Sequence, residues 1–259
     1  FLGDSLIRGM NTDKEKLLNK IINKEVYNAG MDGFSTLNSV AVTNYLFEKK
    51  KFKKIVLFFN IGNDFRDNVF QVEYKKNFKS RLVIFVKNNQ FLNKLSELRF
   101  LSFKKNNKKT KIIEINKPYF GINYLKLLIN DKNFINLTST KTISALKNLR
   151  DLSVKNNAEL LILGIPSISE IYKDIKKIPN LENELKLENI RIDRYNDKVD
   201  FENPKKLFFL VCKNAGVKCE YIPLDIKSYY ELDSDHWNDH GQQITKDFLI
   251  KESNFLIKG

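Results

Sequence analysis

Residues 54–64 read KIVLFFNIGND, and this stretch decides the fold class that the sequence predicts. The run Lys54–Asn60 is almost continuously apolar and lacks the polar alternation of a half-exposed strand. Such a run is typical of a central strand in a parallel sheet that helices cover on both faces. We therefore expect a buried strand here, with the Gly-Asn-Asp of residues 62–64 directly beyond its carboxyl end.

Strands and helices alternate on both sides of this run. We predict four further strands, which begin at Phe1, Glu25, Glu159 and Val217. Helices are predicted over residues 12–24, 35–50, 142–156, 204–214 and 240–257. This alternation is typical of parallel strands joined by crossover helices. We therefore expect a three-layer α/β/α sandwich whose five-stranded parallel sheet has the flavodoxin-like order 2-1-3-4-5.

The chain has 259 residues, which is enough for one large α/β domain. We expect a single domain over residues 1–259, with a helical insertion from about 69 to 139, where the alternation stops. The insertion carries a lysine cluster between residues 104 and 111, which we interpret as a solvated loop. Because the sequence begins with Phe1, we expect its natural N-terminus to be missing.

The formal net charge is +14, from 45 Lys and Arg against 31 Asp and Glu, and lysine supplies almost all of the excess. Proteins that read DNA bases favour arginine, because its guanidinium forms bidentate hydrogen bonds. No helix-turn-helix, RNA-recognition or zinc-finger pattern accompanies the charge, so we expect no nucleic-acid partner. The longest apolar runs have the length of strands, and we expect no transmembrane segment in the given chain.

Neither a metal nor an organic cofactor is expected. The sequence contains no G-x-G-x-x-G and no G-x-x-x-x-G-K, the two glycine-rich patterns that bind phosphates. The chain has two histidines and two cysteines, and their spacing matches no zinc-binding pattern.

Four short blocks each follow a predicted strand or precede a predicted helix. They are Gly3-Asp4-Ser5, the loop 28–36 with Gly33, Gly62-Asn63-Asp64, and residues 233–238 with Asp233 and His236. Parallel strands of an open α/β sheet end at one edge, where such folds bind their ligands. A serine hydroxyl, a glycine N–H, an asparagine amide and an Asp-x-x-His pair supply nucleophile, oxyanion donors, base and orienting carboxylate. Taken singly, each block is also an ordinary turn or a surface ion pair.

Together the four blocks resemble the SGNH (GDSL) hydrolase superfamily, whose four letters correspond to Ser5, Gly33, Asn63 and His236. Three longer matches accompany them. They are Gly62–Asn68, which reads GNDFRDN, the Pro-Ser after the strand that ends at Ile165, and His236–Gly241, which reads HWNDHG. The resemblance covers residues from about 1 to 68 and from about 140 to 257. Arg66, Asp67 and Asn68 are also expected to line the cleft.

This resemblance implies the SGNH-hydrolase fold and a serine esterase that hydrolyses O-acyl esters, of which acetyl esters are favoured. Ser5, His236 and Asp233 would form the triad, and Ser5, Gly33 and Asn63 the oxyanion hole. The substrate would be a small-molecule or glycan acyl ester. Two alternatives stay open: an acyltransferase module, and a non-catalytic SGNH-like binding domain with a lysine-rich surface.

Two residues compete for roles in the fourth block. His240 lies close to His236, but only His236 stands in the Asp-x-x-His spacing, and His240 falls in the first turn of the predicted last helix. Asp235 is the alternative to Asp233 as the orienting carboxylate. We favour Asp233, because a residue rarely bends back onto the ring of its own neighbour.

Cys212 and Cys219 lie near the end of a predicted helix and on the strand that follows. The turn between these elements brings them face to face, so a disulfide and a pair of packed thiols are both open. A disulfide would require an oxidising compartment. We favour a cell-envelope or exported location over a cytoplasmic one.

Overall fold

The computed structural model describes residues 1–4, 17–22, 25–70, 120–188, 191, 195, 198–229, 236–253 and 255–256. The chain divides into two compact units, Phe1–Val69 with Tyr119–Gly259, and Phe70–Pro118. Apart from Phe70, the described residues belong to the first unit. Most of the predicted insertion, including its lysine cluster, lies outside the described residues, and its last part, 120–139, is helical.

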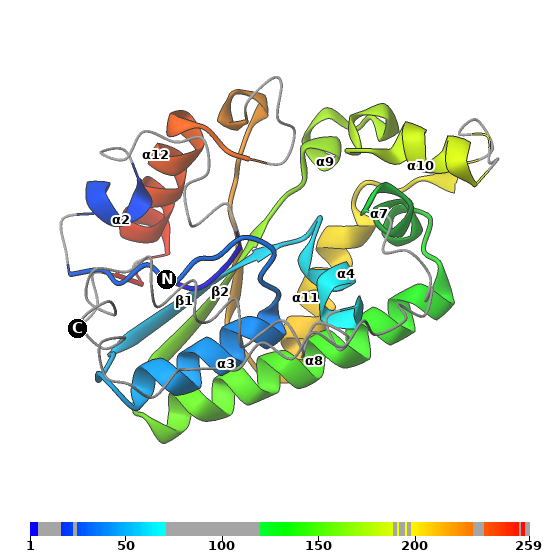
Figure 1. The fold of residues 1–259 in the computed structure, drawn as a ribbon. Helices are drawn as coiled ribbons and strands as arrows, with labels where there is room; N and C mark the ends of the chain where they lie inside the picture. The colour runs from blue at the N-terminus through cyan, green and yellow to red at the C-terminus, as the bar shows by residue number, and fades with distance from the viewer. Residues whose placement is uncertain are drawn as a thin grey trace, which may run out of the picture. The chain divides into compact units, whose positions relative to one another are not determined.

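A parallel sheet forms the centre of the first unit (Figure 1). Its described strands are β1 (Lys54–Asn60), β2 (Glu159–Ile165) and β3 (Cys219–Tyr221), in the order β1-β2-β3. β1 and β2 pair in register along their whole length, so that Asn60 lies opposite Ile165. The α/β class with a parallel sheet is therefore confirmed, and the strand predicted from Val217 is shorter than expected.

Two extended segments continue the hydrogen bonding beyond β1. Leu2 forms a parallel bridge with Leu57, and its N–H donates to the Val56 carbonyl at 2.9 Å. On the other side, the N–H groups of residues 29 and 31 donate to the carbonyls of residues 1 and 3 at 2.8 and 3.1 Å. Neither segment forms a regular strand. The described sheet therefore has three strands, and the five-stranded sheet stays a prediction.

Helices lie on both faces of the sheet (Figure 1). The helices are α2 (Leu18–Ile21), α3 (Thr36–Phe47), α4 (Asp64–Phe70), α7 (Phe120–Leu128), α8 (Lys132–Lys155), α9 (Ile168–Tyr172), α10 (Leu181–Leu187), α11 (Asn203–Ala215) and α12 (Asp239–Asp247), with a π-helical turn at Phe248–Glu252 and 3-10 turns at Ile175–Lys177 and Ile226–Ser228. The helices α3, α8 and α11 lie on one face, and α2 and α12 on the other. Among the described helices, none has both the length and the apolar character needed to cross a bilayer.

The side chains of β1 alternate between two cores. Phe58 meets Trp237, with ring centroids 6.1 Å apart, on the face that α2 and α12 cover. Phe59 meets Phe65 at 5.0 Å and Phe208 at 5.5 Å, on the face that α11 covers. All five aromatic side chains are buried. Both faces of β1 are therefore buried, which agrees with the central strand that its continuously apolar sequence predicted.

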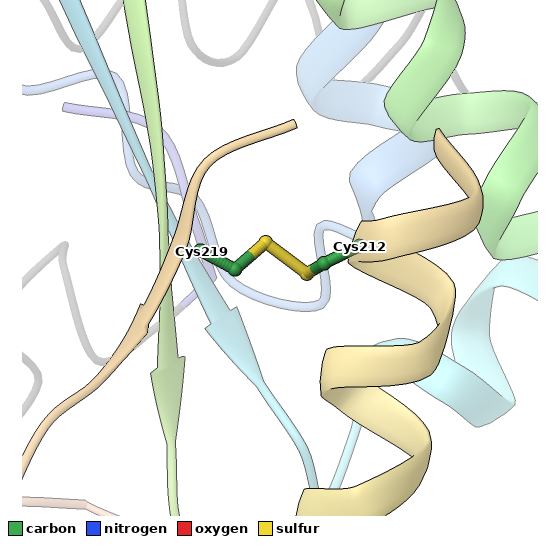
Figure 2. Close-up of a disulfide and its surroundings, with 2 residues drawn as sticks. All are labelled: Cys212 and Cys219. Atoms are coloured by element: carbon green, nitrogen blue, oxygen red, sulfur yellow. A yellow bond between two sulfur atoms is a disulfide. The ribbon is translucent and has the colours of Figure 1, made fainter. Parts of the chain in front are cut away.

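A disulfide joins Cys212 of α11 to Cys219 of β3 (Figure 2). Their Cα atoms are 6.2 Å apart, which is within the usual range for a bridge. Of the two possibilities that the sequence left open, the structure contains the bridge. It therefore fixes the helix to the strand that follows it.

Candidate active site

The candidate site begins where β1 ends. Asn60, the last residue of the strand, is buried, and its Oδ1 accepts the Gly62 N–H at 3.1 Å. The Asn63 N–H donates to the Asn60 carbonyl at 3.0 Å, which closes a tight turn. The Asp67 N–H then donates to the Asn63 carbonyl at 2.9 Å and starts α4. This turn places the Asn63 side chain, which is half-buried, at the carboxyl edge of the sheet.

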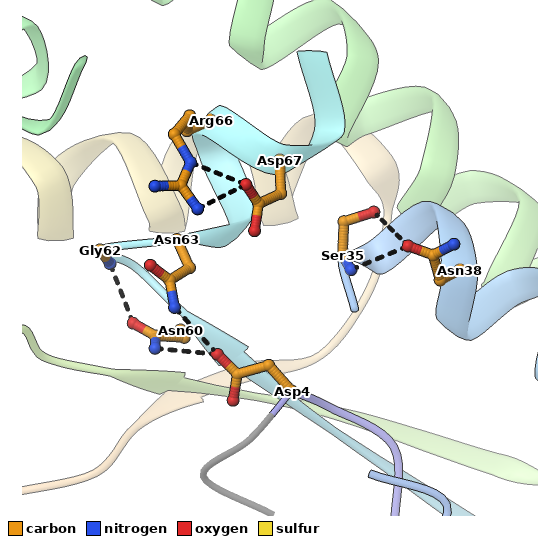
Figure 3. A network of polar contacts seen from close by, with 8 residues as sticks. All are labelled: Asp4, Ser35, Asn38, Asn60, Gly62, Asn63, Arg66 and Asp67. Atoms are coloured by element: carbon orange, nitrogen blue, oxygen red, sulfur yellow. Dashed lines mark hydrogen bonds and ion pairs between the residues drawn. The ribbon is translucent and has the colours of Figure 1, made fainter. Parts of the chain in front are cut away.

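Asp4 joins the first block to the third. Its carboxyl is buried, and one oxygen, Oδ2, accepts the Asn60 Nδ2 at 3.0 Å and the Asn63 Nδ2 at 3.1 Å (Figure 3). Sequence reasoning selected Asn63 but missed Asp4 and Asn60. A usable signal was present, because a polar residue at the end of an apolar strand, such as Asn60, must find a partner when it is buried.

The loop with Gly33 is tied to both of these blocks. The Met31 N–H donates to the Gly3 carbonyl at 3.1 Å, and the Thr36 hydroxyl donates to Asp64 Oδ1 at 3.3 Å. Gly33 has a φ of +66° and is exposed. That left-handed conformation favours glycine by itself. The turn therefore explains the glycine, and its proposed role as an oxyanion donor stays a prediction.

Asp64 is a buried carboxyl directly beside this turn. Its Oδ2 accepts the Asn60 N–H at 2.7 Å. Burial raises the pKa of Asp64 well above its ordinary value, and the negative charges of Asp4 and Asp67 raise it further. Two carboxylates that share one buried site repel each other, so each disfavours the charged form of the other. The charges of Asp4 and Asp67 therefore disfavour the charged form of Asp64.

The residues that follow on α4 divide between two faces. Arg66 and Asp67 are paired at 2.7 Å, and about a sixth of each side chain is exposed (Figure 3). Asn68 is fully buried instead, and its Nδ2 donates to the hydroxyls of Thr36 at 3.3 Å and Thr142 at 3.0 Å. The prediction that Asn68 lines a cleft is wrong, because the residue joins α4 to α3 and α8.

The fourth block is anchored by Trp237. This side chain is 1% exposed, and the residue forms an antiparallel bridge with Tyr229. Asn238 caps α12, because its Oδ1 accepts the N–H groups of residues 240 and 241 at 3.0 and 3.2 Å. His236, directly before the anchored tryptophan, is half-buried. His240 lies on the surface, with its Nε2 3.6 Å from Asp225 Oδ2.

Three of the five predicted site residues are described: Gly33, Asn63 and His236. Ser5 and Asp233, and the alternative Asp235, lie outside the described residues. The structure does bring the first three blocks together, through Asp4, Met31 and Thr36. The packing of Trp237 against Phe58 brings the fourth block to the same strand, β1.

A second polar cluster, which the prediction missed, follows the end of β2. We call it the Glu170 cluster: Tyr124, Ser167, Ser169, Glu170 and Tyr221. Ser167 Oγ lies 2.6 Å from the Tyr124 hydroxyl and 2.8 Å from Ser169 Oγ. The Ser167 N–H donates to Glu170 Oε2 at 2.7 Å, and the Tyr221 hydroxyl donates to Oε1 at 3.1 Å. Burial raises the pKa of Glu170 to about 7. The Ser-x-x-Glu spacing of residues 167–170, a capping box, was the available signal.

In the part of the chain that the structure describes, no group of His, Cys, Asp and Glu side chains could hold a metal ion. A cavity of about 740 Å³ lies beside Glu170 and Tyr221, and Phe201, Lys205 and Phe209 also line it.

Comparison with known proteins finds no family model that matches this chain and no matching curated protein.

Proposed function

We propose that the protein is a serine esterase of the SGNH (GDSL) type that hydrolyses O-acyl esters. The observation that supports this most directly is the 3.1 Å hydrogen bond from Asn63 to Asp4. Because Ser5 follows Asp4 in the chain, this bond brings the backbone next to the candidate nucleophile to the candidate oxyanion donor. Such a pairing of nucleophile and amide donor is what acyl transfer requires.

In the proposed reaction, His236 Nε2 takes the proton of the Ser5 hydroxyl while Ser5 Oγ bonds to the ester carbonyl carbon. The N–H groups of Ser5 and Gly33 and the Asn63 amide stabilise the oxyanion that develops. The tetrahedral intermediate collapses, and the leaving alcohol takes the proton from His236. Water then attacks the acyl-serine by the same route and releases the acid. Asp233 accepts the Nδ1–H of His236 and holds the required tautomer.

The finer fold is part of the same proposal. The segments that contain Leu2 and Ala29 would be the two additional strands of a five-stranded sheet in the order 2-1-3-4-5. Their backbone hydrogen bonds to one another and to β1 support that order. In a flavodoxin-like sheet the switch point lies between the first and third strands, so Ser5 and Asn63 would face each other there.

The substrate and the compartment are also proposals. An acetyl ester on a small molecule or a glycan suits a site built from surface loops. The Cys212–Cys219 bridge supports an oxidising compartment, and hence the cell envelope or an exported location. An acyltransferase would use the same acyl-serine but transfer the acyl group to an alcohol in place of water.

The test combines a fluorophosphonate probe with hydrolysis of p-nitrophenyl acetate. We expect Ser5→Ala to abolish labelling and His236→Ala to abolish turnover. Asn63→Ala should lower kcat by about 10²- to 10³-fold. His240→Ala is the matched control, and it should leave turnover within about twofold, because its ring pairs with Asp225 on the surface. Absence of labelling in the wild-type protein would refute the esterase, and loss of turnover in His240→Ala would refute the choice of base.

A further inference from the structure

We propose that Asp4 is a positioning residue that orients the Asn63 amide so that one of its N–H bonds faces the oxyanion. This inference rests on the proposed function. An asparagine side chain presents a donor nitrogen on one side and an acceptor oxygen on the other. Only the nitrogen stabilises an oxyanion, and a rotated amide would place its oxygen against the developing negative charge.

Asp4 selects the correct orientation because its Oδ2 accepts hydrogen bonds from two amide nitrogens, those of Asn60 and Asn63. Its Oδ2 lies 3.1 Å from Asn63 Nδ2, and the rotated amide would place two acceptors against each other there. One of the two amide hydrogens is engaged with Asp4, which leaves the second for the substrate. The bond to Asp4 therefore fixes the orientation of the amide and leaves one donor available.

Asp4 is itself held in place by a chain of bonds whose direction is defined. The Gly62 N–H donates to Asn60 Oδ1 at 3.1 Å, which requires that Asn60 Nδ2 faces the other way. That nitrogen donates to Asp4 Oδ2 at 3.0 Å. The backbone of the turn thus orients Asn60, Asn60 holds Asp4, and Asp4 orients Asn63 (Figure 3).

The burial of Asp4 and Asn60 stabilises this chain of hydrogen bonds. Asp4 is 2% exposed and Asn60 is 5% exposed, so water competes little for the bond between them. The backbone before Asp4 is fixed as well, because Leu2 is hydrogen-bonded to β1 on either side of Leu57. A single residue therefore connects the backbone next to Ser5 with the side chain of Asn63.

A double-mutant cycle separates this role from a purely structural one. If Asp4 acts through Asn63, Asp4→Ala should lower kcat by about 10- to 100-fold with KM within about twofold. In an Asn63→Ala background, Asp4→Ala should then change kcat by less than about twofold. Asp4→Asn keeps an oxygen that can accept both bonds, so it should retain kcat within about tenfold. Additive losses in the double variant would overturn the proposal.

Glu170→Gln is the matched control, because it changes a buried carboxyl of the same unit outside the candidate site. It should leave kcat within about twofold, and a loss equal to that of Asp4→Ala would show a general effect of stability and overturn the proposal. If Asp4→Ala does not fold, Asp4→Leu replaces it, because leucine fills the space that alanine would leave as a cavity.

A second readout is independent of activity. In a ¹H–¹⁵N spectrum, the two side-chain amide protons of Asn63 should be well separated in the wild-type protein and in Asp4→Asn, because one proton is bonded to residue 4. In Asp4→Ala they should move together. If the wild-type protein neither binds the probe nor hydrolyses esters, the proposed function fails while this spectrum still tests the Asp4 bond. An unchanged Asn63 signal in Asp4→Ala would refute the bond itself.

Discussion

Glu170→Gln should change how the stability of the protein depends on pH. Glu170 is buried and its pKa is raised to about 7, against an ordinary value of 4.5, because burial disfavours its charged form. Between these two values the folded state binds a proton that the unfolded state has lost. The stability that this proton supplies is complete below about pH 4.5, decreases as the pH rises to about 7, and is then constant.

The size of the effect follows from the shift. One pKa unit corresponds to about 1.4 kcal/mol. A rise from 4.5 to about 7 therefore lowers the unfolding free energy by about 3 kcal/mol at a pH where Glu170 is ionised in both the folded and the unfolded state. About 2.5 kcal/mol of this loss falls between pH 5 and pH 8. Glutamine resembles the protonated acid, because its amide can donate to the Tyr221 oxygen while its carbonyl accepts the Ser167 N–H. The variant should therefore lack this loss.

Urea unfolding of both proteins at several values between about pH 5 and pH 8 measures the effect. The difference in unfolding free energy between variant and wild type is the relevant quantity, because the other titrating groups cancel in it. It should shift in favour of Glu170→Gln by about 2.5 kcal/mol over this range. Tyr221→Phe removes a donor that lowers the pKa of Glu170. In this variant the loss of stability with rising pH should therefore extend to a higher pH than in the wild type. A difference that does not vary with pH would refute the reasoning.

Two further predictions concern stability. Replacing Cys212 and Cys219 by serine opens a short loop, and the chain-entropy model predicts a loss of about 2 kcal/mol in unfolding free energy, which reducing and non-reducing urea titrations of the wild type should reproduce. Gly241→Ala should lower the melting temperature, because its Cβ would lie 2.6 Å from the Trp237 Cβ and 2.7 Å from the Ser228 carbonyl oxygen. Overpacking of this kind costs about 1–3 kcal/mol, and an unchanged melting temperature would show that α12 can move away.

The central elements could be predicted from the sequence because their signals are local. The bounds of β1 and β2 match the predicted starts at Lys54 and Glu159, since both strands are continuous apolar runs. The start of α8 was missed by ten residues. Its signal is a single cap, Asp131, whose side chain accepts the Phe134 N–H at 2.9 Å. The residues between this cap and the predicted start carry no clear apolar stripe.

The polar contacts were harder to predict because they join distant parts of the chain. Asp4 is 56 residues from Asn60 and 59 from Asn63, and no local pattern relates them. The error at Asn68 has a different cause. Asp64 and Asn68 are four residues apart on α4, so they lie on the same side of the helix, and that side faces the core. Asn68 also lies three residues after the apolar Phe65, so helical periodicity counted from Phe65 would have placed Asn68 inside.

The parallel register explains why two polar clusters lie at the same edge of the sheet. Asn60 and Ile165 are opposite each other, and the Ile61 N–H donates to the Ile165 carbonyl at 3.2 Å, so β1 and β2 end together. Asn60 begins the cluster around Asp4, and Ser167 begins the Glu170 cluster two residues beyond β2. Buried polar groups need partners, and at a common edge the nearest partners belong to neighbouring loops. The first polar residue at the end of an apolar strand, or directly beyond it, is therefore the position where a sequence search for such clusters should begin.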